Sequence, residues 1–144
     1  MNHILKASQS IQIKSTPAQV WDALTNPDKI RVYLFGTQAE TDWEIGSSIG
    51  FEGEYNGQKY KDKGNVLENN ENELLKYNYW SSFSGLEDKI ENYFLVTYRI
   101  ETESEGDVKF TWEQEGFATE DAQKHTQDGL LALLAQIKRL VEKV

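Results

Sequence analysis

The segment Gly46-Ser47-Ser48-Ile49-Gly50 has the G-x-S-x-G spacing with which many hydrolases expose a nucleophilic serine. That chemistry needs a sharp turn from a strand into a helix, so that backbone N–H groups can form an oxyanion hole. Here the following residues alternate instead, with Ile49, Phe51 and Tyr55 separated by polar or small residues. This alternation predicts a strand, and we therefore expect no serine nucleophile at this position.

Acidic residues are the next candidates for chemistry, because clustered carboxylates can hold metal ions. Seven glutamates lie at one parity of their predicted strands, opposite to the aromatic residues: Glu52, Glu54, Glu101, Glu103, Glu105, Glu113 and Glu115. That parity predicts a solvated outer face. The chain has no cysteine and two histidines, which excludes thiolate and multi-histidine sites. We expect no metal, no cofactor and no dedicated catalytic residue.

One histidine and one glycine interrupt an amphipathic pattern near the C-terminus. On a helical wheel His125 lies at the edge of the apolar stripe, beside Gly129. Such a histidine is either an ordinary boundary residue or a group that hydrogen-bonds a bound ligand. Glycine inside a helix costs about 1 kcal/mol relative to alanine, which indicates either close approach of a strand or space for a ligand. We include His125, Gly129 and Leu133 in a candidate ligand-binding site.

Large aromatic residues are abundant, with 4 Trp, 7 Tyr and 6 Phe. About half of them share the inward parity of their predicted strands: Phe51, Tyr55, Tyr77, Tyr79, Phe94, Tyr98, Phe110 and Trp112. These rings could simply fill a core. However, buried tyrosine hydroxyls need hydrogen-bond partners, which a cavity can provide. We therefore add Phe51, Tyr55, Tyr77, Tyr79, Tyr98 and Trp112 to the candidate ligand-binding site.

The order of predicted elements indicates how these residues are positioned. It comprises a first strand with Ile11 and Ile13, helices at about 17–25 and 28–35, strands at about 48–55, 58–67, 75–79, 94–101 and 108–113, and a helix over 119–144. Asn56-Gly57 is a strong hairpin signal between two of the strands. We expect a single α+β domain over 1–144, with an antiparallel sheet closed by the long C-terminal helix.

The net charge and hydropathy of the chain limit the kinds of partner that it can bind. The 144 residues carry a formal net charge of −9, a field that repels nucleic acids and anionic membranes. The sequence shows no apolar segment of about 20 residues and no signal-peptide pattern. We expect a cytoplasmic protein that binds neither nucleic acid nor membrane, and the oligomeric state stays open.

Two runs of residues, Ser15–Pro27 and Thr41–Ser47, resemble the START-like SRPBCC superfamily, in particular its bacterial branch similar to activators of heat-shock protein 90 ATPase. The run from Tyr79 to Tyr98 is similar to a further signature of that branch. The resemblance implies a helix-grip fold: a curved antiparallel sheet of six to seven strands wrapped around the C-terminal helix, with a hydrophobic cavity between them. Relatives often have tryptophan after the helical glycine, where this chain has Leu130, so the cavity dimensions should differ.

Three functions are compatible with that resemblance, and fold alone does not choose among them. The first is binding of a hydrophobic or amphipathic small molecule between the sheet and the C-terminal helix. The second is co-chaperone stimulation of a heat-shock protein 90 type ATPase. The third is a polyketide cyclase-like enzyme, in which pocket shape orients the substrate and His125, a tyrosine or a carboxylate transfers protons. We expect the first, a non-catalytic binding protein.

Overall fold

The computed structural model of the chain describes residues 5–34, 36–82 and 85–142. Within these residues, seven strands form one antiparallel sheet in the order β1-β7-β6-β5-β4-β3-β2. The strands are β1 (Lys6–Ile13), β2 (Gln38–Glu40), β3 (Ser48–Tyr55), β4 (Gln58–Asn70), β5 (Leu74–Trp80), β6 (Phe94–Ser104) and β7 (Asp107–Glu115). The helices are α1 (Pro17–Thr25), α2 (Pro27–Tyr33) and α3 (Glu120–Glu142), with a short 3-10 helix, η1 (Ile90–Asn92). The predicted α+β helix-grip architecture is confirmed.

Two strands of the structure differ from the prediction. The short edge strand β2 was not predicted, because three residues are too few to show a period. The strand β4 runs to Asn70 rather than ending near Leu67, since an irregularity between Val66 and Glu68 lets it pair with β5 on both sides of the interruption. The prediction ended there because Asn69 to Asn72 have the composition of a turn, whereas in the structure Asn69 and Asn70 still pair with β5.

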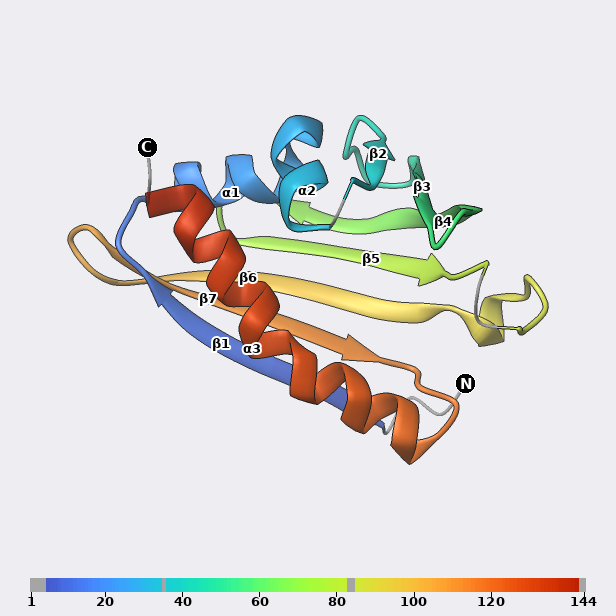
Figure 1. The fold of residues 1–144 in the computed structure, drawn as a ribbon. Coiled ribbons are helices and arrows are strands. Elements are labelled where there is room, and N and C mark those ends of the chain that lie inside the picture. Colours follow the sequence, from blue (N-terminus) through green and yellow to red (C-terminus); the bar gives the residue numbers. More distant parts are fainter. Residues whose placement is uncertain (1–4, 35, 83–84, 143–144) are drawn as a thin grey trace.

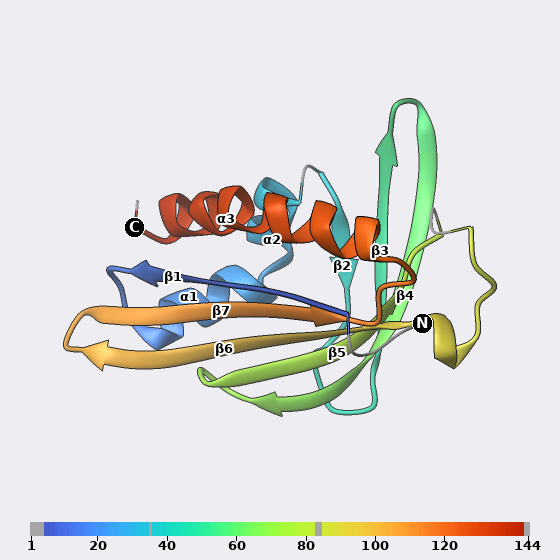
Figure 2. The ribbon, with the colours of Figure 1, turned by 90° about the horizontal axis from the view of Figure 1, so that it is seen from below.

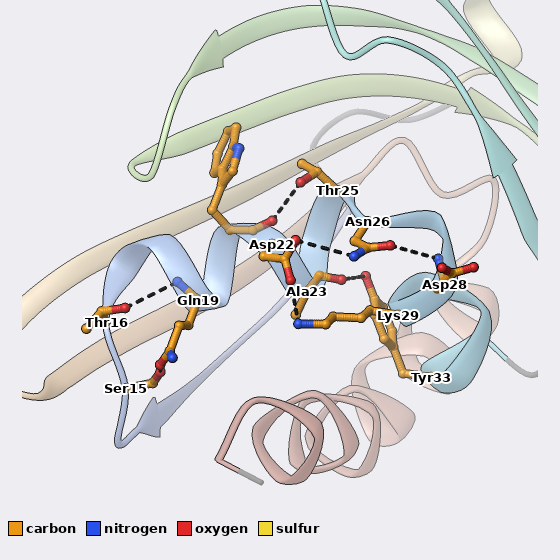
Figure 3. Close-up of polar contacts among 11 residues, drawn as sticks. Ser15, Thr16, Gln19, Asp22, Ala23, Thr25, Asn26, Asp28, Lys29 and Tyr33 are labelled. Carbon is orange, nitrogen blue, oxygen red and sulfur yellow. Dashed lines mark hydrogen bonds and ion pairs between the residues drawn. The ribbon is translucent and has the colours of Figure 1, made fainter. Parts of the chain in front are cut away.

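The pair α1 and α2 is fixed by side chains at the helix ends (Figure 3). The Thr16 hydroxyl accepts a hydrogen bond from the Gln19 N–H at the start of α1. Asn26 serves both helices: its N–H donates to the Asp22 carbonyl, and its side chain accepts from the Asp28 N–H. The buried Tyr33 hydroxyl donates to the Ala23 carbonyl oxygen at 3.0 Å. These contacts fix where α1 ends and α2 begins, and the Tyr33 hydrogen bond holds the last residue of α2 against α1.

The helix α3 crosses β1 and β7 diagonally (Figure 1) and packs chiefly against β1. The sheet curls, so that the β3–β4 hairpin stands on the same side as α3 (Figure 2). The apolar side chains of α3 that are buried are Leu130, Leu134, Ile137 and Val141. No helix in the described part of the chain is long and apolar enough to span a membrane.

Polar side chains of α3 also bond the outer edge of β1, which has a partner strand on one side only. The Gln127 amide accepts from the Ser8 N–H at 2.8 Å and donates to the Ser8 carbonyl at 2.7 Å. Gln123 and Lys138 donate to the carbonyl oxygens of Lys6 and Gln12. The helix therefore pairs edge groups that would otherwise be available to another strand.

Candidate functional site

A cavity of about 400 Å³ lies against the inner face of the sheet, on the side of β3, β4 and β5. Strand alternation brings its side chains to one face, and the segment after α2 closes part of it. The described residues that line it are Leu34, Thr37, Phe51, Tyr60, Asp62, Tyr77, Tyr79, Ser81, Val96, Trp112 and Gln114. None of them belongs to α3, which corrects the expectation of a cavity between sheet and helix: α3 lies over β1, where close apolar packing fills the space.

Aromatic rings form the apolar part of this cavity. Phe51 contacts Tyr77 and Tyr79, with ring centroids 6.0 and 5.7 Å apart. Tyr98 lies behind them, 5.5 Å from Tyr77 and 4.7 Å from Trp112. Most of these pairs are tilted or edge-to-face, the arrangements that ring quadrupoles favour. The rings therefore support one another and hold a fixed wall.

The tyrosine hydroxyls find partners within the protein. Tyr77 and Tyr98 share a hydrogen bond of 2.7 Å, and Tyr79 donates to Asp62 at 2.5 Å. Burial raises the pKa of Tyr77 and of Tyr98 well above 10, and burial with the nearby Asp62 carboxylate does the same for the pKa of Tyr79. These phenols stay neutral near pH 7. The inward hydroxyls therefore do not by themselves indicate a cavity, because they pair with each other and with a carboxylate.

That carboxylate, Asp62, was not predicted as a site residue. It is 5% exposed and lines the cavity. Besides the Tyr79 hydroxyl, it accepts hydrogen bonds from the Ser82 N–H and the Ser82 hydroxyl, both at 2.8 Å. A signal was present in the sequence, since Asp62 has the same strand parity as the buried Val66, while Lys61 and Lys63 have the exposed parity. A carboxylate at an inward position needs a specific environment.

Trp112 contributes a second unusual polar group. Its side chain lines the cavity, and its indole N–H is buried without an acceptor among the described residues. Two other tryptophans differ: Trp43 donates to the Thr25 carbonyl at 2.9 Å, and Trp80 donates to the Leu86 carbonyl. Buried N–H groups rarely lack an acceptor in folded proteins. The Trp112 ring therefore forms part of the cavity wall, while its indole N–H is enclosed and has no acceptor among the described residues.

The remaining predicted site residues lie elsewhere. His125 and Gly129 are on the exposed side of α3, and Leu133 is half-buried against the core, all outside the described lining of the cavity. A Cβ built at Gly129 meets no atom within 4 Å, so neither a strand nor the lining of the cavity explains this glycine. The side chain of Tyr55 lies outside the described part of the structure.

The motifs considered for hydrolysis and metal binding take other roles. Ser48 is the first residue of β3 and is exposed, so the G-x-S-x-G segment leads into a strand as predicted. Among the described residues, no group of three or more acidic or histidine side chains is placed to hold a metal ion. Glu101, Glu103 and Glu105 are exposed at the β6–β7 hairpin. These three glutamates are solvated as predicted, although Glu105 lies in the turn after β6 and not on a sheet face.

A curved seven-stranded sheet, a long C-terminal helix and an aromatic cavity define a START-like helix-grip domain. Comparison with family models agrees, since residues 14–142 match the family described as activator of Hsp90 ATPase homolog 1-like protein. The chain belongs to this family. Comparison with curated proteins gives no significant match.

Solved structures show the same fold. The solution structure of ChR145 from Cytophaga hutchinsonii is 36% identical, with a TM-score of 0.84, over 99% of this chain and 97% of that one. The Aha1 dimer from Colwellia psychrerythraea is 16% identical with a TM-score of 0.73, covering 95% and 96% of the two chains. An HSP90 activator from Plasmodium falciparum, PFC0360w, is 14% identical with a TM-score of 0.70, again over 95% and 96%.

Proposed function

We propose that this chain binds a hydrophobic or amphipathic small molecule in the cavity beside β3, β4 and β5. The observation that supports this function is the cavity itself, about 400 Å³ with aromatic walls and a few polar groups. Small-molecule sites in proteins have volumes of roughly 300–1,000 Å³ and this mixture of lining groups. Phe51, Tyr77, Tyr79 and Trp112 supply the apolar contact area.

The test uses a neutral fluorescent probe, N-phenyl-1-naphthylamine, together with variants that fill or spare the cavity. Leu34 lines the cavity at the end of α2, whereas Val32 on the same helix is 58% exposed. We expect Leu34→Trp to weaken probe binding at least tenfold and Val32→Trp to leave it unchanged. Equal binding by both variants, or no binding by the unchanged protein, contradicts the proposal. Native mass spectrometry after gentle purification then identifies any retained ligand.

Membership of the activator family supports a second candidate, stimulation of a heat-shock protein 90 type ATPase. In that function the outer surface of the domain contacts the chaperone and the cavity is not required. Calorimetry against the isolated chaperone domains, with an ATPase assay, tests it. Absence of both heat and stimulation at high concentration removes this candidate, and stimulation that persists in Leu34→Trp separates it from ligand binding.

A further inference from the structure

The Asp62 carboxylate faces the cavity without a positively charged partner. It takes part in no ion pair with a lysine or arginine among the residues that the structure describes, although Lys61 and Lys63 flank it in sequence. Those two lysines lie on the other face of β4, where they pair with Glu52 and Asp88. Among the described residues, no lysine or arginine pairs with this buried carboxyl group in the cavity.

Three neutral donors bind this carboxylate: the Tyr79 hydroxyl and the N–H and hydroxyl of Ser82. A carboxylate has about four acceptor positions, so roughly one stays available. Burying a charge is unfavourable unless it is hydrogen-bonded and paired. A positively charged donor that entered from the cavity would supply both a further hydrogen bond and the opposite charge, whereas an anionic group would be repelled.

The neighbouring rings favour the same kind of ligand group. Phe51, Tyr77 and Tyr79 line the cavity together with Asp62. Aromatic faces attract ammonium groups through their quadrupoles, and this attraction is larger in a desolvated site. Rings and a carboxylate around one space form a set of groups suited to a protonated amine.

We propose that the cavity selects an amphipathic amine: an apolar body that contacts the aromatic rings, with a protonated amino group that donates to Asp62. This inference rests on the proposed binding function and adds the chemical class of the ligand. It excludes fatty-acid anions as preferred ligands, because their carboxylate would face Asp62.

The test compares three probes with one skeleton: 4-phenylbutylamine, 4-phenylbutan-1-ol and 4-phenylbutanoate. Binding of each probe is measured by calorimetric titration at pH 7, a pH at which the amine is protonated. We expect the amine to bind at least tenfold more tightly than the alcohol, since hydrogen bonds to charged groups are the stronger kind, and the carboxylate to bind most weakly. Equal affinities for amine and alcohol overturn the inference but leave the proposed function standing, whereas no binding by any probe contradicts both.

Three variants test whether the preference for the amine depends on the charge of Asp62. Asp62→Asn keeps the shape and removes the charge: its oxygen can still accept from Ser82, and its N–H₂ faces the Tyr79 hydroxyl, which can accept instead of donate. The advantage of the amine over the alcohol should therefore disappear, while the alcohol binds about as before. Asp121→Asn, at the exposed start of α3, makes the same change in net charge and should preserve that advantage. Tyr79→Phe keeps the Asp62 charge and releases one acceptor position, so the preference for the amine should persist. A preference that survives Asp62→Asn, or that Asp121→Asn or Tyr79→Phe abolishes, overturns the assignment to Asp62.

Discussion

The inner face of the sheet has two halves that differ in how closely their side chains are packed. Under α3 the contact is apolar and closed: Leu134 and Ile137 of the helix and Ile13 of β1 are fully buried. Beside β3, β4 and β5 the same face carries a cavity with a buried carboxylate and an unpaired indole N–H. One helix covers only part of a curved sheet, so the packed half can stabilise the domain while the open half is available for a ligand.

Truncation in the packed half should have the largest effect. Leu134→Ala should lower the free energy of unfolding by about 4 kcal/mol, because a fully buried side chain leaves a cavity that neighbours fill incompletely. Leu131→Ala, three residues earlier on the exposed side of α3, should change it by less than about 0.5 kcal/mol. Urea unfolding measures both. Similar values for the two leucines would mean that α3 does not pack as described.

The open half also depends on close packing between its strands. A Cβ at Gly64 would overlap the backbone carbonyl oxygen of Asn78 on β5, whereas a Cβ at Gly50 meets no atom within 4 Å. Gly64→Ala should therefore destabilise the protein by about 2–3 kcal/mol, since the backbone must shift, and Gly50→Ala should be nearly neutral. Thermal unfolding of the pair provides the measurement. If Gly64→Ala is also neutral, β4 and β5 separate more readily than the structure indicates.

The hydrogen bonds between polar side chains of α3 and the edge of β1 should contribute less to the free energy of unfolding. Gln127→Ala removes two hydrogen bonds to Ser8, so the expected loss is about 1–2 kcal/mol. Hydrogen exchange of the Ser8 amide should become faster in this variant. Asp128→Ala, at the exposed neighbouring position, is the control and should leave that exchange unchanged. Unchanged Ser8 protection in Gln127→Ala contradicts the proposed closure of the edge.

A substitution on the exposed side of α3 should have the smallest effect on the free energy of unfolding, and it should stabilise the protein. Gly129 lies in open space within a helix, so Gly129→Ala should stabilise the protein by about 0.5–1 kcal/mol through helix propensity. The same urea series detects this gain. Probe binding should not change, because Gly129 lies outside the described lining of the cavity. Destabilisation, or weaker binding, would mean that a group packs over this position.

Periodicity predicted the main elements because each depends on local sequence. Alternation in β3, β5, β6 and β7 placed Phe51, Tyr77 and Trp112 on the inner face, and these residues do line the cavity. Alternation did not single out Asp62, because it was used to identify apolar inward residues and Asp62 is a polar residue at an inward position. His125 and Gly129 were selected from a helical wheel, which gives the angle of a residue around the helix but not the partner that the helix faces.

The sequence by itself determined the faces: strand parity, helix caps and the outward position of many carboxylates all follow from nearest neighbours along the chain. The tertiary structure alone shows which half of the sheet α3 covers and that the tyrosine hydroxyls pair with one another and with Asp62. It also shows that the Trp112 N–H has no acceptor among the described residues. The physical reason is that burial and hydrogen bonding join residues far apart in the chain. Their partners depend on the curvature and register of the whole sheet, which no local pattern records.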